Sequence, residues 1–390
     1  MLKGLFTMKN IKYIGFYDRE ENKKENRNYV LSAVNKMDYI INSLVREGFS
    51  VEIISPSWTY NKKRYFSSLT EIKKNVKLKL FKTLPWGNKL FKFISLLYSA
   101  ISLFFYVMKN SEKNEKIIVY HSPYLFLCIY LLKKLKGIYL ILEVEEKYSD
   151  VKKVNYFFKK MEMAVINSSD AFIYSTELFR ESINNSKPIV ICNGIYLKKE
   201  ISKVKFNDGK KHLVYSGIID KYKGSEMALE AALYLSNLFH IHIIGFGRDI
   251  DIRNLEDKIN EYKSKTECII SYDGVLFGDE YNKFLQKCDL GLSTQKSNIS
   301  FNETSFPSKI FSYLSNNLRV VSVRLKTIEV CQVNHILYYY DGDSPINLAD
   351  SIKKIDFNDE YSGMDSIDKL DREFRSQLKD IICEGENNDS

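Results

Sequence analysis

A loop that combines two glycines with two lysines has the residue types needed to hold a phosphorylated ligand. It runs from Ser216 to Gly224 (SGIIDKYKG), directly after the strand-like run HLVY and before a helical stretch. Glycines let a ligand approach the backbone, a lysine supplies a positive charge, and the free amides of a helix start bind anions. The spacing matches neither a Walker A loop nor a GxGxxG fingerprint, so a plain solvated turn is the alternative.

A second loop with similar chemistry runs from Phe301 to Lys309 (FNETSFPSK), after the strand-like run DLGLSTQ. Pro307 pre-sets the first turn of the helix that follows. Thr304, Ser305 and the free amides of that turn could bind an anion, while Lys309 adds a charge. Simple helix capping is the alternative. Two anion-suited loops in one half of the chain favour a diphosphate site there.

The elements that must position these loops alternate between strand-like and helix-like segments. The first half has expected strands over 11–16, 50–55, 116–120, 138–143 and 171–174, with a helix over 29–47. The second half has expected strands over 212–215, 240–244, 268–272, 289–292, 319–323 and 336–340, and helices over 225–236, 280–287 and 308–315. This βαβ alternation predicts doubly wound, mostly parallel sheets, whose ligands bind beyond the carboxyl ends of the strands.

The length of 390 residues fits two domains of roughly 150–200 residues each. The polar, lysine-rich connector over 197–211 marks the boundary. We therefore expect an N-terminal Rossmann-like domain over 1–198 and a C-terminal one over 199–360. A last helix over about 364–382 is expected to pack back near the first domain.

The overall charge and the cysteines restrict the class of protein. A net charge of +9 suits anionic partners, but no dense arginine tract or zinc-finger spacing indicates nucleic acid. The six cysteines form no CxxC pair, so buried free thiols in a reducing cytosol are expected. The first residues do not read as a signal peptide, which also favours a cytoplasmic protein.

In one segment, 77–109, five lysines precede the apolar run 93–107. The run is shorter than the roughly 20 residues that span a bilayer. Three interpretations stay open: a buried helix of the N-terminal domain, a basic and apolar surface that docks on anionic lipid, and, least favoured because of its length, a transmembrane helix.

The C-terminal half resembles glycosyltransferase family 4, the retaining enzymes of the GT-B fold. VYSGIIDKYKG is similar to the family's glycine and lysine motif at the donor phosphates, and HIHIIGFG to its strand followed by GxG. ISYDGVLFGDEYNKFLQKCDLGLST is similar to its base-binding turn, helix and strand, and TSFPSKIFSYLSNNLRVVS to its donor-binding loop. IVICNGIYL resembles the linker segment, with Cys192 in place of proline. The five pieces stand in the family's order over about 188–325.

The resemblance implies an α/β GT-B fold, with two Rossmann-like domains whose parallel sheets face a central cleft. It implies a hexosyltransferase that moves a sugar from a UDP- or GDP-linked donor, with retention at the anomeric carbon and without a metal cofactor. A glycan or polyprenyl-linked acceptor in bacterial capsule or other surface polysaccharide synthesis would fit. The enzyme would be cytoplasmic, with a peripheral position on the inner face of the cell membrane.

Matching motif positions give the expected site. The donor-binding set is Gly217, Lys221, Lys223, Gly245, Gly247, Gly274, Thr304, Ser305, Phe306, Ser308, Lys309 and Ser312. Lys223 is the first choice for the phosphates, and we expect Lys223→Ala to lose most transfer while the protein still folds. The N-terminal half matches more loosely. His121 falls at a strand end where the family often keeps a histidine near the reacting sugar. Glu143 ends the next strand, where related enzymes often carry an acidic or histidine residue. These two and Glu303 form the expected catalytic set, with packing or solvated positions as the alternatives.

The chain departs from the family where two glutamates eight positions apart are usual. Thr304 and Ser312 stand at those positions, with Glu303 beside the first. The usual contacts to ribose and sugar are therefore in doubt. Two other functions stay open: a non-catalytic GT-B partner subunit, and a sugar-nucleotide epimerase.

The sequence patterns that resemble metal-binding motifs are interpreted as structural. The pairs Asp249/Asp251 and Asp341/Asp343 have the DxD form of metal-dependent glycosyltransferases, but we interpret them as loop charges. His240 and His242 lie on one face of an expected strand. No third ligand is evident in the sequence, so we interpret this pair as packing.

Overall fold

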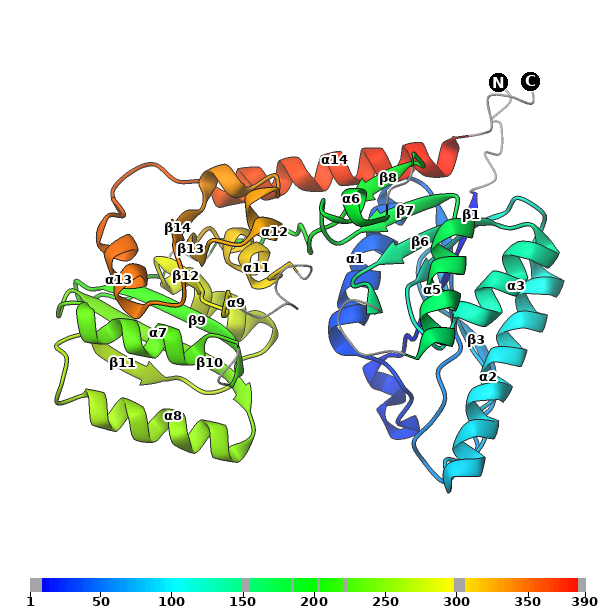
Figure 1. Cartoon of the computed structure of the whole chain (residues 1–390), viewed down its shortest axis with the longest axis horizontal. Helices are drawn as coiled ribbons and strands as arrows, with labels where there is room; N and C mark the ends of the chain where they lie inside the picture. Colours follow the sequence, from blue (N-terminus) through cyan, green and yellow to red (C-terminus); the bar gives the residue numbers. More distant parts are fainter. Residues whose placement is uncertain are drawn as a thin grey trace. The chain divides into compact units, whose positions relative to one another are not determined.

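The computed structural model describes residues 9–148, 155–183, 186–201, 204–220, 223–297 and 306–384 (Figure 1). The chain divides into two compact units. Unit 1 comprises 1–175, 179–192 and 373–390, and unit 2 comprises 176–178 and 193–372. The boundary expected at 198 lies a few residues after the division at Cys192.

Unit 1 is built on an eight-stranded sheet in the order β3-β4-β2-β1-β5-β6-β7-β8. The strands are β1 (Asn10–Ile14), β2 (Ser50–Ser55), β3 (Ser68–Lys73), β4 (Val76–Leu80), β5 (Lys116–Tyr120), β6 (Tyr139–Val144), β7 (Ala171–Tyr174) and β8 (Ile189–Ile191). The helices are η1 (Glu20–Glu25), α1 (Leu31–Arg46), α2 (Lys89–Asn110), α3 (Phe126–Lys136), α5 (Tyr156–Ser168) and α6 (Phe179–Ile183). All neighbouring strands are parallel except β3, which pairs antiparallel with β4. Continuous apolar runs such as KIIVY form β5 because helices cover both faces of such a sheet.

Helix α14 (Gly363–Cys383) belongs to unit 2 up to residue 372 and to unit 1 from residue 373. In unit 1, Phe374 stacks on Tyr39 of α1 with ring centroids 5.3 Å apart. Arg375 forms an ion pair with Glu47 at 2.7 Å. Lys379 also pairs with Glu47, at 3.4 Å, so the second half of α14 packs on unit 1 through aromatic and charged contacts.

Helix α2 is 22 residues long and apolar enough to cross a membrane by length and composition. Only Ser95, Ser99, Leu103 and Val107 are buried along it. The helix packs against α3 (Figure 1). The opposite side carries exposed apolar residues: Leu90, Phe91, Phe93, Ile94, Leu97, Ile101 and Phe105. The interpretation of this segment as a buried helix is therefore wrong; most of its apolar surface faces outward within unit 1.

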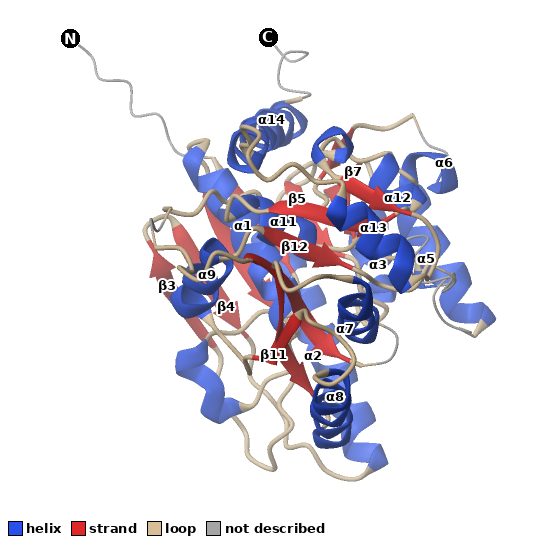
Figure 2. Cartoon of the chain, turned by 90° about the vertical axis from the view of Figure 1, so that its left-hand side faces the viewer, coloured by secondary structure: helices blue, strands red, loops and turns tan. Residues whose placement is uncertain are grey.

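Unit 2 has a six-stranded, fully parallel sheet in the order β11-β10-β9-β12-β13-β14. The strands are β9 (Lys211–Ile219), β10 (Phe239–Gly247), β11 (Ile269–Tyr272), β12 (Leu290–Ser293), β13 (Arg319–Val323) and β14 (Tyr338–Tyr340). The helices are α7 (Ser225–Ala231), η2 (Ala232–Tyr234), α8 (Asp249–Tyr262), α9 (Gly278–Lys287), α11 (Lys309–Ser315), α12 (Lys326–Glu329), η3 (Asn334–Ile336) and α13 (Pro345–Lys353). Helix α7 packs on β9 and β10, and α8 packs on β10 and the edge strand β11 (Figure 2).

Two strands of unit 2 are longer than the sequence predicts, because glycines keep them paired. β9 runs to Ile219 and β10 to Gly247, with Gly245 opposite Gly217. A Cβ added to Gly245 would lie 1.8 Å from the Gly217 carbonyl oxygen. The GxG segment thus continues β10 rather than ending it. Asp249 and Asp251 begin helix α8, which corrects their interpretation as loop charges.

Candidate functional site

The two candidate loops leave neighbouring strands at the centre of the unit 2 sheet. β9 lies between β10 and β12, and the chain returns to β12 after crossing from β11. Because crossover connections are right-handed, the helices after β9 and β12 must cover opposite faces of the sheet. The carboxyl ends of such a strand pair form the switch point where open α/β sheets bind ligands. Both loops thus end at the position that this fold uses for binding.

The first loop also contacts the end of β12 directly. Gly224, at the start of α7, has a φ of 96°. A Cβ at this position would lie 2.1 Å from the Thr294 carbonyl oxygen, so only glycine fits. The Thr294 hydroxyl donates to the Gly224 carbonyl at 2.7 Å. The end of β12 therefore holds the end of the first loop in place.

Lys309, the first residue of α11, supplies the positive charge at this point. Its Nζ lies 4.0 Å from the centre of the Tyr215 ring and 3.2 Å from the position of a Cβ on Gly217. Within the described part of the chain it forms no ion pair. Burial and the neighbouring charge of Lys223 lower the pKa of Lys309 to about 7. An anionic ligand would stabilise the charged form of Lys309 in this environment.

The first loop is fixed by hydrogen bonds to its own backbone. The Tyr215 hydroxyl lies 2.9 Å from the Ile218 carbonyl and 3.0 Å from that of Lys223, and it donates its proton to these two acceptors. The Asp220 carboxylate accepts from the Lys223 amide at 2.6 Å. These bonds preorganise the backbone around Gly217 before any ligand arrives.

A cluster of hydroxyl groups lies behind the loops on β9, α9 and α11. The Tyr281 hydroxyl is 3.0 Å from the Ser216 hydroxyl and 3.1 Å from that of Ser312. The Tyr313 hydroxyl accepts from the Ser216 amide at 2.9 Å. The sequence indicated Ser312 but neither tyrosine, because their contacts depend on how α9 and α11 cross β9. The Tyr281 hydroxyl thus has two serine partners.

The remaining expected donor residues divide into three groups. Gly245 and Gly247 pack against the backbone of β9, and the Gly274 carbonyl accepts from the Gly245 amide at 2.9 Å. Phe306 is buried against Phe311, with ring centroids 5.0 Å apart, whereas Ser308 is exposed and forms no side-chain cap. The expected residues Lys221, Glu303, Thr304 and Ser305 lie outside the described residues.

His121 follows β5 in unit 1 and is fully enclosed, with 1% of its surface exposed. Its Nδ1 lies 3.0 Å from the Glu146 carbonyl and must donate to it, so Nε2 carries the lone pair. Nε2 lies 3.5 Å from a Glu162 carboxylate oxygen and has no hydrogen-bond partner among the described residues. Burial lowers the pKa of His121 to about 4, so the ring is neutral at physiological pH. The bond from Nδ1 holds the loop after β6.

Glu143, on β6, is also completely buried. It accepts a hydrogen bond from the Tyr13 hydroxyl of β1. Burial and the nearby Glu145 carboxylate raise the pKa of Glu143 well above its usual range, although Lys36 opposes the effect. Lys36 of α1 pairs with Glu145 and donates to the Cys192 carbonyl at 2.8 Å. Glu143 is therefore a core carboxyl, and Glu145 is the partly exposed member of the pair.

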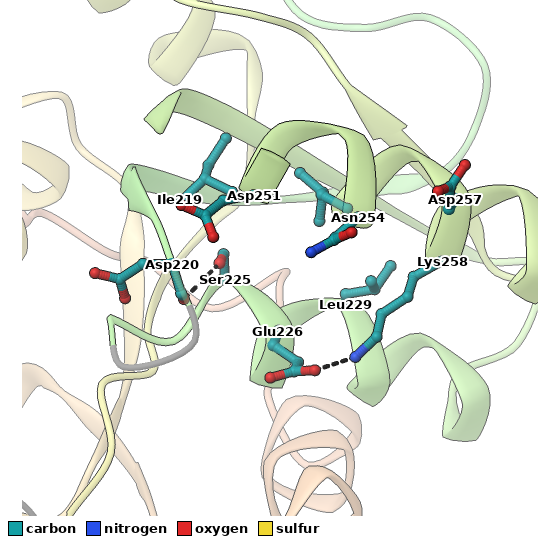
Figure 3. A pocket seen from close by; sticks show the side chains of 10 residues that line it. Ile219, Asp220, Ser225, Glu226, Leu229, Asp251, Asn254, Asp257 and Lys258 are labelled. Atoms are coloured by element: carbon teal, nitrogen blue, oxygen red, sulfur yellow. Dashed lines mark hydrogen bonds and ion pairs between the residues drawn. The ribbon is translucent and has the colours of Figure 1, made fainter. Parts of the chain in front are cut away.

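A cavity of about 440 Å³ lies between α7 and α8 (Figure 3). Its charged lining is mainly acidic: Asp220, Glu226, Asp251, Asp257 and Lys258. Lys258 is already paired with Glu226. Because the lining would repel a diphosphate, this cavity does not fit the anion that the loops suit.

No family model matches the chain, and no curated protein matches its sequence. Solved structures do match its fold. The E. coli trehalose-6-phosphate structure bound with UDP-2-fluoro glucose matches with a TM-score of 0.69 and 11% identity, over 96% of this chain and 99% of that one. Sucrose-phosphate synthase from Thermosynechococcus elongatus matches with a TM-score of 0.62 and 11% identity, over 96% and 95%. A glycosyltransferase from Rickettsia africae ESF-5 matches with a TM-score of 0.59 and 12% identity, over 97% and 95%.

These likenesses span nearly the full length of each chain, and at such low identity they establish the fold. The protein has the α/β GT-B fold, with one parallel or mostly parallel sheet in each unit.

Proposed function

We propose that the protein is a glycosyltransferase that moves a hexosyl group from a nucleoside diphosphate donor to an acceptor hydroxyl. The observation that carries the proposal is Lys309, whose strained ammonium group stands over Gly217 at the switch point of the unit 2 sheet. The GT-B fold adds support, since one structure that shares it holds UDP-2-fluoro glucose. The E. coli complex favours UDP over GDP as the nucleotide to test first.

In this proposal unit 2 binds the donor at the loops after β9 and β12. Lys309 and Lys223 neutralise the diphosphate, and the Gly217 backbone allows its close approach. Lys221, Thr304 and Ser305 would complete the phosphate contacts, with Glu303 near the sugar. The Ser216, Tyr281 and Ser312 hydroxyls replace the carboxylate that the related family uses for the ribose.

The chemical demand is the charge that develops on the leaving diphosphate. Fixed positive groups and preorganised amides stabilise such a charge without reorganising during the reaction. With retention, the acceptor hydroxyl attacks from the face that the diphosphate leaves, and the leaving oxygen takes its proton. The two lysines can stabilise the charge on the leaving diphosphate without a bound metal.

For unit 1 we propose acceptor binding, with His121 and Glu143 as positioning residues. His121 Nδ1 holds the Glu146 carbonyl, and Glu143 holds Tyr13 beneath the same loop. Both therefore set the position of the segment after β6, which begins with the partly exposed Glu145. In this account the two residues act through Glu145 and its neighbours.

The exposed side of α2 supports a peripheral position on an anionic membrane. Phe93, Leu97, Ile101 and Phe105 repeat every four residues and form one outward stripe. Lys89 and Lys92 are exposed in the first turn of the helix, and Lys77 of β4 and Lys134 of α3 are exposed as well. An apolar stripe flanked by lysines binds anionic lipid surfaces. A polyprenyl-linked acceptor at the cytoplasmic face of the membrane would then be within reach.

A donor screen tests the proposed activity. The protein is incubated with UDP- and GDP-sugars, singly, and the release of nucleoside diphosphate is measured with and without added lipid-linked acceptor. We expect slow hydrolysis of one donor and faster release with acceptor. Binding without release would instead indicate a non-catalytic partner subunit, which the missing glutamate pair favours. Conversion of the donor to another UDP-sugar without release would indicate an epimerase.

A further inference from the structure

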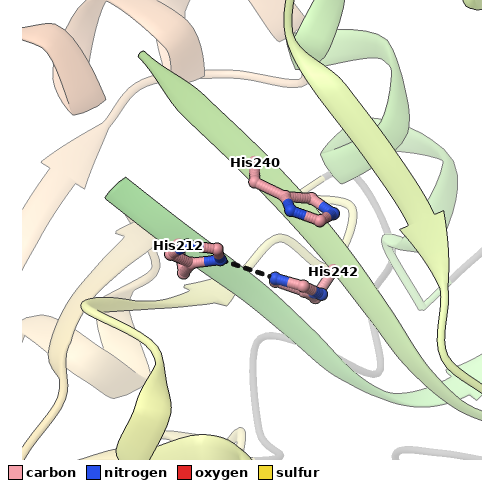
Figure 4. A group of neighbouring side chains, drawn as sticks. All are labelled: His212, His240 and His242. Atoms are coloured by element: carbon pink, nitrogen blue, oxygen red, sulfur yellow. Dashed lines mark hydrogen bonds between the residues drawn. The ribbon is translucent and has the colours of Figure 1, made fainter. Parts of the chain in front are cut away.

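Three of the five histidines in the chain meet on one face of the unit 2 sheet. His212 of β9 is the register partner of His240 of β10, and His242 lies two residues further along β10. Side chains alternate along a strand, so all three point to the same face. One ring nitrogen from each histidine lies within 4.8 Å of the others (Figure 4).

The outer nitrogens of two of these rings are bound to carboxylates. His212 Nε2 lies 2.9 Å from Asp208 Oδ1, and His242 Nδ1 lies 2.9 Å from Asp273 Oδ2. An ionised carboxylate only accepts hydrogen bonds, so both ring nitrogens must carry the proton. The lone pairs therefore sit on His212 Nδ1 and His242 Nε2.

Those two nitrogens face each other at 2.8 Å, as the dashed line in Figure 4 shows. Two lone pairs cannot form a hydrogen bond without a proton between them. The pair therefore needs a positive species in addition to the protons on the outer nitrogens: either one more proton or a cation that both nitrogens coordinate.

The proton on the third ring, that of His240, can be assigned in the same way. Ser271 donates its one proton to Asp273 at 2.8 Å, so its oxygen accepts from His240 Nε2 at 3.0 Å. The lone pair of His240 is then on Nδ1. All three histidines thus bind protein acceptors through one nitrogen and leave the other as a metal-ligand atom.

We propose that this histidine cluster, His212, His240 and His242, is a binding site for a divalent transition metal, with Zn²⁺ as the best fit. Neutral imidazoles are preferred ligands of zinc, and each usually donates its other N–H to a carboxylate or other acceptor. Asp208 and Asp273 fill that role, and their two negative charges balance the ion. Tetrahedral ligands about 2.0–2.1 Å from zinc are about 3.3 Å apart. On metal binding the 2.8 Å contact between His212 and His242 would open, and His240 would move closer where its nitrogen now lies further away, within the 4.8 Å limit.

The surroundings enclose the site on one side and leave an entry on the other. The Phe206 ring stacks on His212 at 4.0 Å, and Phe284 of α9 packs edge-on against His242 at 5.2 Å. His212 and His242 are each 2% exposed, whereas His240 is partly exposed. A metal can reach the cluster past His240, and a water would occupy the fourth position.

The position of the cluster indicates a stabilising rather than a chemical role. His212 lies at the start of β9, on the same face as Ser216 near its end. Helix α9 covers both places, since Phe284 contacts His242 and Tyr281 contacts Ser216. A metal would fix β9, β10 and α9 together at the end of the sheet opposite the candidate loops. This inference does not depend on the proposed transferase activity.

The test measures metal binding by the intact protein, purified without a histidine tag and treated with a chelator. Zn²⁺ and Co²⁺ are titrated separately, with calorimetry for the first and visible absorption for the second. We expect one equivalent of each to bind, a Co²⁺ spectrum of low coordination number, and a higher melting temperature with Zn²⁺. The absence of saturable binding in the wild-type protein would overturn the proposal and leave a shared proton between His212 and His242.

Three variants assign the binding to the cluster. His240→Asn, at the partly exposed ligand, should weaken Zn²⁺ binding by about 100-fold or more, and Asp208→Asn by about 10-fold to 100-fold. Asp208 lies in an exposed segment, so its variant should fold if His240→Asn does not. His335→Asn, at an exposed histidine outside the cluster, should bind as the wild type does. Equal binding by folded His240→Asn and wild-type protein would show adventitious zinc and refute the site.

Discussion

The ammonium group of Lys309 lies 4.0 Å from the centre of the Tyr215 ring, beside the backbone of Gly217. Burial disfavours the charged form of Lys309, and the Lys223 charge adds repulsion, so the pKa of Lys309 falls to about 7. A bound diphosphate would reverse both effects and raise the pKa again.

This change gives a pH-dependent signature of binding. At pH 8 most Lys309 is neutral in the free protein and becomes protonated when the diphosphate binds, so binding should take up close to one proton. Calorimetry of UDP binding in buffers of different ionisation enthalpy measures this number. Lys309→Met should remove the uptake, and an unchanged uptake in that variant would assign the proton to another group.

The contact between Gly245 and Gly217 predicts a loss of stability. In Gly245→Ala the new methyl group would lie 1.8 Å from a backbone oxygen, which cannot move without breaking the pairing of β9 and β10. We expect a decrease of about 4 kcal/mol or more in the free energy of unfolding of unit 2, measured by urea denaturation.

Gly274→Ala is the matched control, because Gly274 has a φ of 76° but no atom within 4 Å of an added Cβ. It should lose only about 1–2 kcal/mol from the left-handed backbone. Equal losses in the two variants would show that the close contact between the strands contributes nothing.

The buried Glu143 predicts a pH dependence of stability in unit 1. Its pKa is raised on folding, so the folded state holds the proton more tightly than the unfolded state. The stability it contributes is fully present at acid pH and is lost as the pH rises from the usual carboxyl range through the raised pKa. Glu143→Gln keeps an acceptor for Tyr13 and removes this loss. Melting temperatures from pH 5 to pH 9 should therefore fall more steeply for the wild type.

Glu52→Gln supplies the baseline for that comparison. Glu52 also lies on a strand and accepts a hydrogen bond from a tyrosine, Tyr106, at 2.5 Å, but it is partly exposed. A difference between wild type and Glu143→Gln that stayed constant with pH would contradict the account of a protonated core carboxyl.

The exposed stripe of α2 predicts binding to anionic vesicles. Replacing Phe93, Leu97 and Phe105 together with serine should reduce co-sedimentation with phosphatidylglycerol vesicles by about tenfold or more, because three apolar side chains no longer enter the interface. Binding should weaken at high salt and be slight with phosphatidylcholine alone. Leu238→Ser, which changes an exposed leucine of unit 2, serves as the control. Equal sedimentation of all three proteins would exclude α2 as the membrane-binding surface.

Local sequence patterns were sufficient for much of the fold. The strands expected over 50–55, 116–120, 171–174 and 319–323 have those bounds in the structure, because each is an apolar run between clear turn residues. The β3–β4 hairpin was not predicted, since β3 is polar and largely exposed at the sheet edge. The strand predicted over 212–215 was shorter than β9, because pairing between glycines, not local preference, extends β9.

Less of the candidate site than of the fold could be predicted from the sequence. The motif order located Gly217 and Lys309, but the Tyr281 hydroxyl contacts depend on packing between helices. The burial of Glu143 beside Tyr13 follows from strand order, which no local pattern shows. The third histidine of the cluster, His212, lies 28 positions before His240 and becomes a neighbour only through the register of β9 and β10.

The most direct test of the account is calorimetric binding of UDP and GDP to the wild-type protein, Lys309→Met and Lys223→Ala. We predict that one of the two nucleotides binds the wild type with one site per chain, and that each variant binds it at least about tenfold more weakly while remaining folded. Absence of binding by the wild type, or equal affinity in both variants, would contradict a donor site at the loops after β9 and β12.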